Sequence, residues 1–299
     1  MVFNRYMHVE RLTEGNSEID GILNGEVYIY PKLDGSNHCI WWDDDVGEVR
    51  CASRNHVLTP ERDSTKFVQT YFLSHKVNAV AMATEYYNMT FYGEFMRPHV
   101  IKDYADRVWD DWFVFDVYDR NEHRWLSFEE YQPILDKYKV SYIPPMKKMD
   151  SPSIADVYAC VDDNHFMMMN DAVGEGVVIK NYSFVNVYGR TTWAKVVRDE
   201  FRVAYRSTPE ERGEDVSIEN KIISQYLNSD FIEKEYHKFV DEYGEWSDKM
   251  IPSFIKHVIR EWWADYSYDV IATQRYTIDM NNFRKIMSRK IVRKVKSMQ

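Results

Sequence analysis

Residues 28–37 read YIYPKLDGSN, a stretch in which a predicted β-strand ends at a lysine and an Asp-Gly pair. Apolar residues alternate with polar and aromatic ones just before it, which predicts a strand at Glu26–Tyr30. Lys32 follows this strand, and a lysine amine becomes a nucleophile when burial or neighbouring cations favour the loss of its proton. Gly35 has no Cβ, so the backbone here can approach a bound group closely. The alternative is an exposed lysine before an ordinary turn, and this stretch alone does not separate the two.

Five further short elements follow in order along the chain, each at or near a predicted strand. They are SR at 53–54, YGE at 92–94, FVFDVY at 113–118, EGVVIK at 175–180 and the strand WAKVV at 193–197, which contains Lys195. The KxDG pattern at 32–35 is weak evidence alone, because it arises by chance in on the order of a few per cent of chains this long. Each further element taken singly is equally typical of a strand end or of core. Their common order argues against coincidence.

The first two thirds of the chain have a mixed α/β pattern. Alternation and β-branched or aromatic content predict strands at Glu26–Tyr30, His38–Trp42, Glu48–Ser53, Met89–Phe95, Trp112–Tyr118, Gly176–Asn181 and Thr192–Val197. A helix is predicted at Lys66–Tyr87, which contains neither proline nor glycine, and another from the capping-box pattern at Ser127 to about Tyr138. We therefore expect an α+β domain with antiparallel sheets.

After Arg206 the strand patterns stop. Helical spacing predicts helices at Ile218–Leu227, Phe231–Tyr243, Pro252–Tyr266 and Met280–Lys296. The polar stretch 207–215 contains a proline and a glycine, which is typical of a boundary. The sequence thus predicts one domain at 1–206 and a helical domain at 207–299.

Charge and composition exclude several classes of protein. Hydrophobic residues make up 44% of the 299 residues, which is enough for a core, and no apolar run reaches the roughly 20 residues of a membrane span. Three cysteines without metal-ligand spacing indicate a reducing, cytoplasmic setting without structural zinc. The net charge of −10 argues against nucleic-acid binding through bulk charge, but Asn282–Gln299 holds seven basic residues and no acid. The rest carries 31 basic and 48 acidic residues, a net charge of −17.

With these motifs in order, the chain resembles the covalent nucleotidyltransferases, which comprise DNA ligases, RNA ligases and mRNA capping enzymes. The resemblance covers residues 1–205, and its most specific parts are KLDG at 32–35 and EGVVIK at 175–180. Asn37 and the early Tyr6 segment are most similar to the RNA ligase 2-type branch. The resemblance implies that Lys32 attacks the α-phosphorus of ATP to form lysyl-AMP. AMP then passes to a 5′-phosphate on RNA, and a 3′-hydroxyl displaces it to seal the strand.

The same resemblance implies roles for particular residues. Catalysis would use Lys32, Glu175, Lys180 and Lys195, and the nucleotide would contact Tyr30, Pro31, Lys32, Asn37, Arg54, Glu94, Phe115, Lys180 and Lys195. The cations suit the negative phosphates of ATP, and Glu175 and Glu94 suit Mg²⁺, for which Mn²⁺ would substitute. Phe115 is the candidate for stacking on adenine, with Phe113 as its rival.

The chain departs from the family pattern at its last motif, where two lysines usually stand in a K-x-K arrangement. Trp193 takes the first position and Lys195 remains, with Arg198 three residues later. The contact of Lys195 with the α-phosphate is therefore less secure than the role of Lys32. Arg198 is a candidate to share it.

The C-terminal part indicates the branch. DNA ligases and capping enzymes usually continue into a small β-barrel, whereas this chain continues into predicted helices, which favours an RNA ligase. Candidate RNA-binding residues are Arg198, Arg284, Lys285, Arg289, Lys290, Arg293 and Lys294. For the last six, the alternative is a solvated helix face.

Three hypotheses follow from the sequence. We expect a monomeric ATP-dependent RNA ligase that acts on 5′-phosphate and 3′-hydroxyl ends, in a compact form that suits a phage RNA-repair enzyme in its host's cytoplasm. The alternatives are an ATP-dependent DNA ligase without the usual barrel and a non-catalytic nucleotide- or RNA-binding module. The natural RNA substrate does not follow from the sequence.

Overall fold

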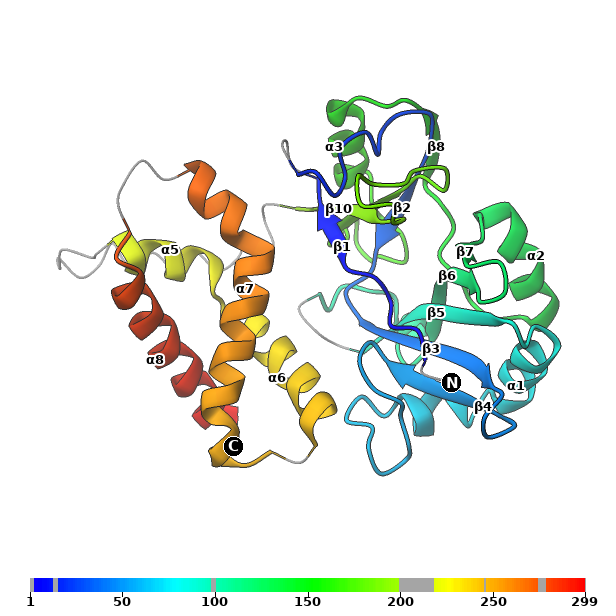
Figure 1. Cartoon of the computed structure of the whole chain (residues 1–299), viewed down its shortest axis with the longest axis horizontal. Helices are drawn as coiled ribbons and strands as arrows, with labels where there is room; N and C mark the ends of the chain where they lie inside the picture. The colour runs from blue at the N-terminus through cyan, green and yellow to red at the C-terminus, as the bar shows by residue number, and fades with distance from the viewer. Residues whose placement is uncertain are drawn as a thin grey trace. The chain divides into compact units, whose positions relative to one another are not determined.

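The computed structural model describes residues 3–12, 16–97, 101–198, 218–244, 246–273 and 278–298. The chain divides into two compact units, Met1–Arg198 and Asp199–Gln299 (Figure 1). The first unit holds two five-stranded sheets with helices, and the described part of the second holds helices. The predicted α+β class is therefore confirmed. The predicted boundary stretch at 207–215 lies outside the described residues.

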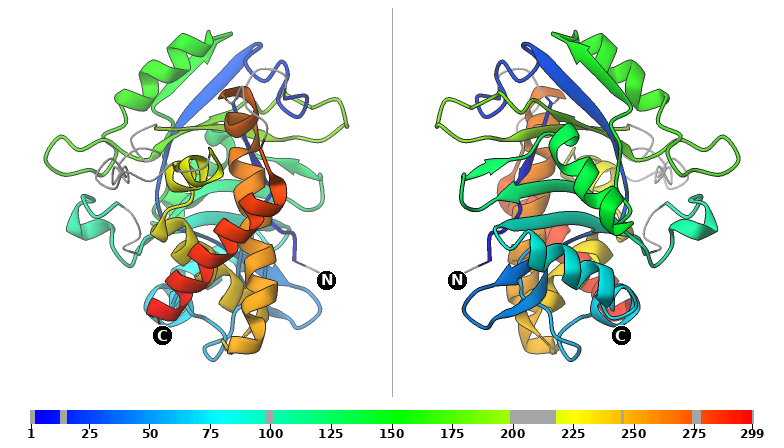
Figure 2. Two further views of the ribbon diagram at one scale, coloured as in Figure 1. Left: turned by 90° about the vertical axis from the view of Figure 1, so that its left-hand side faces the viewer. Right: turned by 90° about the vertical axis from the view of Figure 1, so that its right-hand side faces the viewer.

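The first sheet carries the candidate nucleophile. Its strand order is β1 (Val9–Arg11), β10 (Trp193–Val197), β9 (Gly176–Lys180), β2 (Glu26–Lys32) and β8 (Lys147–Asp150). β1 runs parallel to β10, and the other neighbours are antiparallel. One face lies against α3 (Ile154–Asp162) (Figures 1 and 2). Buried aliphatic side chains such as Ile29 and Val177 belong to the core cluster between them. Because side chains alternate along a strand, Lys32 points to the opposite face.

The second sheet lies next to that opposite face. Its order is β4 (Glu48–Ser53), β3 (Ser36–Asp43), β5 (Met89–Phe95), β6 (Trp112–Asp119) and β7 (Arg124–Trp125). α1 (Lys76–Glu85) and α2 (Phe128–Tyr138) bury its outer face in the largest core cluster of this unit. Aromatic side chains from both sheets, Trp41, Tyr92 and Trp193 among them, form one cluster between them. The β2–β3 connection crosses from one sheet to the other, which places the Asp-Gly pair at their junction.

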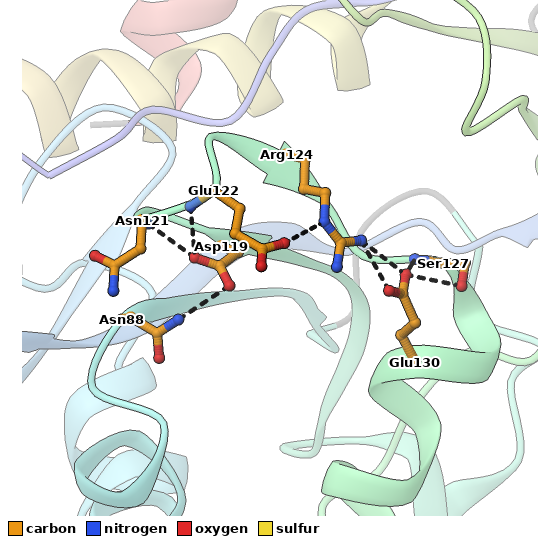
Figure 3. A network of polar contacts seen from close by, with 7 residues as sticks. All are labelled: Asn88, Asp119, Asn121, Glu122, Arg124, Ser127 and Glu130. Carbon is orange, nitrogen blue, oxygen red and sulfur yellow. Dashed lines mark hydrogen bonds and ion pairs between the residues drawn. The ribbon is translucent and has the colours of Figure 1, made fainter.

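The capping box predicted at the start of α2 is confirmed. Glu130 Oε2 accepts hydrogen bonds from the backbone N–H of Ser127 at 2.7 Å and from its hydroxyl at 3.0 Å (Figure 3). Arg124 of β7 also contacts the Glu130 carboxylate. Asp119 accepts hydrogen bonds from the Asn88 side-chain amide and from the backbone N–H groups of Asn121 and Glu122 in the turn that follows it. These bonds satisfy the exposed N–H groups of the helix end and of the turn between β6 and β7.

One helix prediction is corrected. Lys66–Tyr87 forms a π-helical turn (Val68–Phe72) and then α1, rather than one continuous helix. Asp63 accepts a hydrogen bond from the backbone N–H of Val68, and the turn buries Tyr71 and Phe72 in the core. Tertiary contacts of this kind override helical periodicity, and no proline or glycine marks the break.

The strand predictions hold where the strand is apolar. β2 extends two residues beyond the predicted end, so Lys32 is its last residue. β1, β7, β8, α3 and a short 3-10 turn (Asp106–Val108) were not predicted. β8 is an edge strand with mostly exposed, charged side chains, so it lacks the alternation that identifies a strand.

The second unit confirms the four predicted helices. They are α5 (Ile218–Tyr226), α6 (Ser229–Tyr243), α7 (Ile251–Thr273) and α8 (Met280–Met298), with a 3-10 turn (Asp248–Met250) before α7. A core of its own contains Phe254, Trp262 and Phe283. Among the described residues of the chain, no helix is long and apolar enough to cross a membrane.

Candidate active site

Lys32 lies against Glu175, at the junction of the two most specific motifs. Its Nζ is 2.5 Å from Glu175 Oε2, and both side chains are mostly buried, with 19% and 13% exposed. Lys32 pairs across β2 and β9 with Gly176, the residue after Glu175. Antiparallel pairing therefore joins two groups that are 143 residues apart in the chain. The carboxylate is placed to hold the ammonium and to accept a proton from it.

Two glycines allow the chain to pack this closely. A Cβ at Gly176 would lie 2.0 Å from the backbone oxygen of Val196 on β10, so a larger residue would displace one of the two strands. A Cβ at Gly35 would lie 2.6 Å from the backbone oxygen of Phe95 on β5. Gly35 was expected to make room for a bound group, and the structure shows that it makes room for a strand.

Asp34 and Tyr104 fix the loop after Lys32. The backbone N–H of Asp34 donates to the Tyr104 hydroxyl at 2.9 Å, and Asp34 Oδ2 accepts from the backbone N–H of Ile101 at 2.9 Å. Burial raises the pKa of Tyr104, and the negative charges of Glu175, Asp34 and Glu94 raise it further. Three carboxylates thus surround this phenol. Tyr104 was missed in the sequence because it belongs to no motif.

Asn37, Glu94 and Phe113 are cross-strand neighbours in the second sheet. Asn37 pairs with Glu94, and Glu94 pairs with Phe113. Directly paired residues point to the same face, so the three side chains lie side by side. Glu94 Oε1 also accepts a hydrogen bond from the backbone N–H of Gly35 at 3.1 Å. The structure therefore brings Asn37 and Glu94 to the loop that carries the candidate nucleophile.

Lys180 was predicted to contact the nucleotide, and the structure places it away from Lys32 along the sheet. It pairs with Tyr28, four residues before Lys32 and so about 13 Å away along the strand. Its side chain is 2% exposed, and its Nζ lies 2.8 Å from Asp116 Oδ1 and 2.6 Å from the backbone oxygen of Phe115. Burial lowers the pKa of Lys180, although the charge of Asp116 opposes this shift. The structure does not join Lys180 to Lys32 in one cation cluster.

Asp116 is the centre of a buried polar network. It accepts hydrogen bonds from the Tyr6 hydroxyl at 2.5 Å and from Trp193 Nε1 at 3.1 Å, in addition to its contact with Lys180. Burial raises the pKa of Asp116, and the charge of Lys180 lowers it again. Trp193, the departure from the K-x-K pattern, therefore provides an N–H donor where the family has a cation.

A shift in register between β5 and β6 leaves Phe115 partly exposed. Tyr92 pairs with Asp116 and Gly93 pairs with Val114, which leaves Phe115 without a partner on β5. Such bulges turn an extra side chain toward a site. Phe115 is half-buried, and its ring packs edge-on against Tyr6 with 5.0 Å between centroids, whereas Phe113 is 4% exposed. Phe115 thus has more free surface than its rival.

The remaining predicted contacts are those of Lys195, Arg54 and Arg198. Lys195 pairs with Val178 of β9, and Lys32 pairs with Gly176 of the same strand. Positions 176 and 178 lie on one face of the sheet, so Lys195 lies on the same face as Lys32, two strands away. Arg54 donates to the backbone oxygen of Met7 at 3.4 Å, and Arg198 donates to that of Val173 at 3.2 Å. The backbone N–H of Arg198 also donates to the backbone oxygen of Glu175 at 3.0 Å.

Tyr30 and Pro31 were both predicted to contact the nucleotide. Tyr30 is 2% exposed, its hydroxyl lies 3.0 Å from that of Tyr182, and the Lys180 ammonium is 4.4 Å from its ring centre. Pro31 points to the face opposite to Lys32 because side chains alternate along β2. The structure therefore places the Pro31 ring on the other face of the sheet from Lys32, and its contact with the nucleotide stays a prediction.

The predicted metal ligands are carboxylates near the nucleophile. Glu175 contacts the Lys32 ammonium and Glu94 accepts from the Gly35 N–H, so each has an oxygen atom in use. Within the described residues, no group of three or more His, Cys, Asp or Glu side chains forms a metal cage. Mg²⁺ commonly binds one or two carboxylates together with substrate phosphates and water, and these two residues fit that arrangement.

The predicted RNA-binding residues of α8 fall on two faces. Arg284, Lys285, Arg289 and Arg293 are exposed. Lys290 is half-buried and donates to the backbone oxygen of Ile223 at 3.4 Å, and burial lowers its pKa. Lys294 lies 3.0 Å from the Glu233 carboxylate. Two of the six helix residues are thus occupied inside their own unit.

Comparisons with known proteins give a family and a fold. A family model described as RNA ligase matches residues 25–197, more than half of the chain. Three solved mutants of an RNA ligase from Naegleria gruberi share the fold. They are a lysine-to-methionine mutant with AMP and Mn, an arginine-to-alanine mutant with ATP and Mn, and a lysine-to-alanine mutant with ATP and Mn. Each of the first two is 18% identical to this chain with a TM-score of 0.52, and the match covers 68% of this chain and 58% of that chain. The third is 19% identical with a TM-score of 0.51, and the match covers 65% of this chain and 56% of that chain.

The match therefore covers less than two thirds of the length of those structures. No curated protein matches the chain.

Proposed function

The chain belongs to the RNA ligase family, and from this premise we propose that it is an ATP-dependent ligase that seals RNA through an AMP adduct on Lys32. The contact between Lys32 and Glu175 carries the proposal. It joins an amine, a proton acceptor and a loop held by Asp34 in one place. Nucleophilic catalysis by an amine needs these parts, because the protonated form has no lone pair for attack.

The first step is a displacement at phosphorus. The Lys32 ammonium gives a proton to Glu175, and the free Nζ attacks the α-phosphorus of ATP. A P–N bond forms, the bond from the α-phosphorus to the bridging oxygen breaks, pyrophosphate leaves, and the bonded nitrogen gives its second proton to water. Lys195 and Arg54 are the candidate cations for the phosphates, and Phe115 for adenine stacking. A bound Mg²⁺ or Mn²⁺ on Glu94 and Glu175 would neutralise charge on the phosphates.

Lys180 receives a revised role in this proposal. Its ammonium bonds Asp116 and the backbone oxygen of Phe115, the two residues at the bulge in β6. It therefore positions Phe115 rather than contacting the α-phosphate. Trp193 supports the same carboxylate from the other side.

In the later steps, a 5′-phosphate on RNA takes AMP from Lys32, and a 3′-hydroxyl then displaces AMP to form the phosphodiester. The exposed basic side chains of α8 are the candidate contacts for RNA phosphates, and such contacts weaken as salt rises.

Incubation with α-labelled ATP and Mg²⁺ tests the first step. The wild type should retain acid-stable label after denaturation, and Lys32→Ala should retain none. The matched control is Lys147→Ala on β8 of the same sheet, where an exposed lysine contacts Asp163, and it should label normally. An unlabelled wild type would favour a non-catalytic binding module.

A panel of nicked duplexes tests the substrate. We expect sealing of a nick with RNA on its 3′-hydroxyl side to be faster than sealing of an all-DNA nick. Faster sealing of the DNA nick would replace the proposal by a DNA ligase.

A further inference from the structure

The helical unit contains a cavity that the ligase chemistry does not use. It has a volume of about 420 Å³ and lies between the end of α6 and the first half of α7. This volume falls in the range of ligand-binding pockets. All of its lining residues belong to the helical unit.

One wall of the cavity is cationic. Lys249, Lys256 and Arg260 line it, and their spacing of seven and four residues places them on one side of α7 and the turn before it. All three are exposed, and none of the described lining residues is acidic. Arg260 also contacts the neighbouring Glu261 at 2.9 Å. An exposed pair of this kind is weak, so the guanidinium can exchange it for a phosphate.

The other wall is aromatic. Tyr243 is 54% exposed, and its ring lies 4.4 Å from that of the buried Phe239, with an angle of 37° between the planes. Phe239 supports the inner side of the Tyr243 ring. More than half of Tyr243 is exposed, and an exposed aromatic ring can stack on any base.

The floor of the cavity is held in place by a buried network of hydrogen bonds around the Glu235 carboxylate. His257 Nε2 lies 2.9 Å from Glu235 Oε2, and Lys238 contacts the other oxygen of that carboxylate at 2.5 Å. Arg260 donates to His257 Nδ1 at 3.3 Å, which orients the guanidinium along the rim. A rigid floor lowers the entropic cost of binding.

We propose that this cavity binds one nucleotide of single-stranded RNA, with the base on Tyr243 and the phosphate between Lys256 and Arg260. A cationic groove beside an open aromatic ring is the combination that single-strand binders use. An acidic peptide would pair with the cations but would not stack on the Tyr243 ring. The site belongs to a different unit of the chain from Lys32, and its binding is measured without turnover.

Fluorescence anisotropy with a single-stranded oligoribonucleotide, blocked by a dye at its 5′ end, tests the proposal. We expect Lys256→Ala/Arg260→Ala to weaken binding about tenfold and to reduce the slope of log affinity against log salt by about 0.7, as the loss of one neutralised phosphate requires. Tyr243→Ala should weaken binding about tenfold, whereas Tyr243→Phe should stay within twofold of the wild type. Lys221→Ala, an exposed lysine of α5, is the matched control.

Equal affinities of the control, the double variant and Tyr243→Ala would overturn the proposal. So would equal losses for Tyr243→Phe and Tyr243→Ala, which exclude stacking. Polyglutamate that competes as well as the oligoribonucleotide would assign the cavity to an acidic protein instead. Labelling of Lys32 by ATP is measured in the same variants and should not change. Failure of labelling in the wild type would reject the ligase chemistry without changing the binding result.

Discussion

Glu175 is the residue on which the first chemical step depends most closely, because its Oε2 lies 2.5 Å from the Lys32 ammonium. Glu175→Gln keeps the size of the side chain but removes the proton acceptor. We expect the rate of Lys32 labelling to fall by about 10²-fold or more, the range for loss of a general base. Time courses of labelling with saturating ATP measure it. The control is Glu26→Gln, which changes an exposed carboxylate at the start of β2, the strand that ends at Lys32. A variant rate within threefold of the wild type would remove Glu175 from this role.

Asp116 gives a second residue-scale prediction, on stability. Asp116→Ala leaves the Lys180 ammonium buried without its counter-charge, which should lower the free energy of unfolding by about 3–5 kcal/mol. Urea unfolding measures this value. Asp116→Ala/Lys180→Met removes both charges and should recover most of the loss. If the double variant is no more stable than the single one, the buried ion pair is not the cause.

Residues were predicted unequally well from the sequence. Lys32, Glu175 and Glu94 were predicted from short motifs and Asn37 from its place five residues after Lys32, and the structure gathers the four around one loop. Tyr104 lies outside every motif and was missed. Lys180 stands in a motif, but only the tertiary structure shows that its ammonium contacts Asp116, 64 positions away in the sequence.

At the scale of elements, α8 separates two kinds of basic residue. Lys285, Arg289 and Arg293 lie four residues apart and form an exposed stripe. Lys285→Ala/Arg289→Ala/Arg293→Ala should reduce the slope of log RNA affinity against log salt by about 2, because single strands release about 0.7 ion per phosphate contact. Anisotropy from low to high salt measures the slope. Lys294→Ala, whose ammonium contacts Glu233, is the control and should leave the slope unchanged.

The triple substitution tests the role of the basic stripe more directly than deletion of α8 would. Phe283, Met287, Ile291 and Val295 of α8 are buried in the core of the helical unit, so removing the helix would unfold that unit. If the triple variant binds RNA with the wild-type slope of log affinity against log salt, the stripe is a solvated helix face without RNA contacts.

The contact between α6 and α7 predicts a pH dependence. Burial favours a higher pKa for Glu235, but the charge of Lys238 and hydrogen bonds from His257 and Lys238 outweigh it and lower the pKa to about 2. Its ordinary value is 4.5, so the carboxylate adds about 3 kcal/mol of stability above pH 4.5. That contribution declines as the pH falls from 4.5 toward 2.

Thermal unfolding at pH 5 and pH 3 tests this dependence. The wild type should lose stability between these values, and Glu235→Gln should lose less over the same interval because it cannot be protonated. Identical losses in the two proteins would assign the pH dependence to other carboxylates.

At the scale of the whole molecule, two compact units with separate cores predict two unfolding events. Phe283→Ala removes a buried ring from the helical core and should destabilise that unit by about 3–5 kcal/mol. Differential scanning calorimetry should show one transition moving down and the other unchanged, and labelling of Lys32 should persist at a temperature between them. A single transition that moves as a whole would show that the units unfold together.

The sequence by itself determined the order of the motifs, the change from strands to helices, and the identity of the candidate nucleophile. These depend on local spacing, which a linear pattern records. The tertiary structure alone decided which lysine meets Glu175, which one is buried beside Asp116, and that Pro31 lies on the other face of the sheet from Lys32. The reason is physical: strand register and alternation assign each side chain to a face, and register is set by pairing between segments more than 100 residues apart.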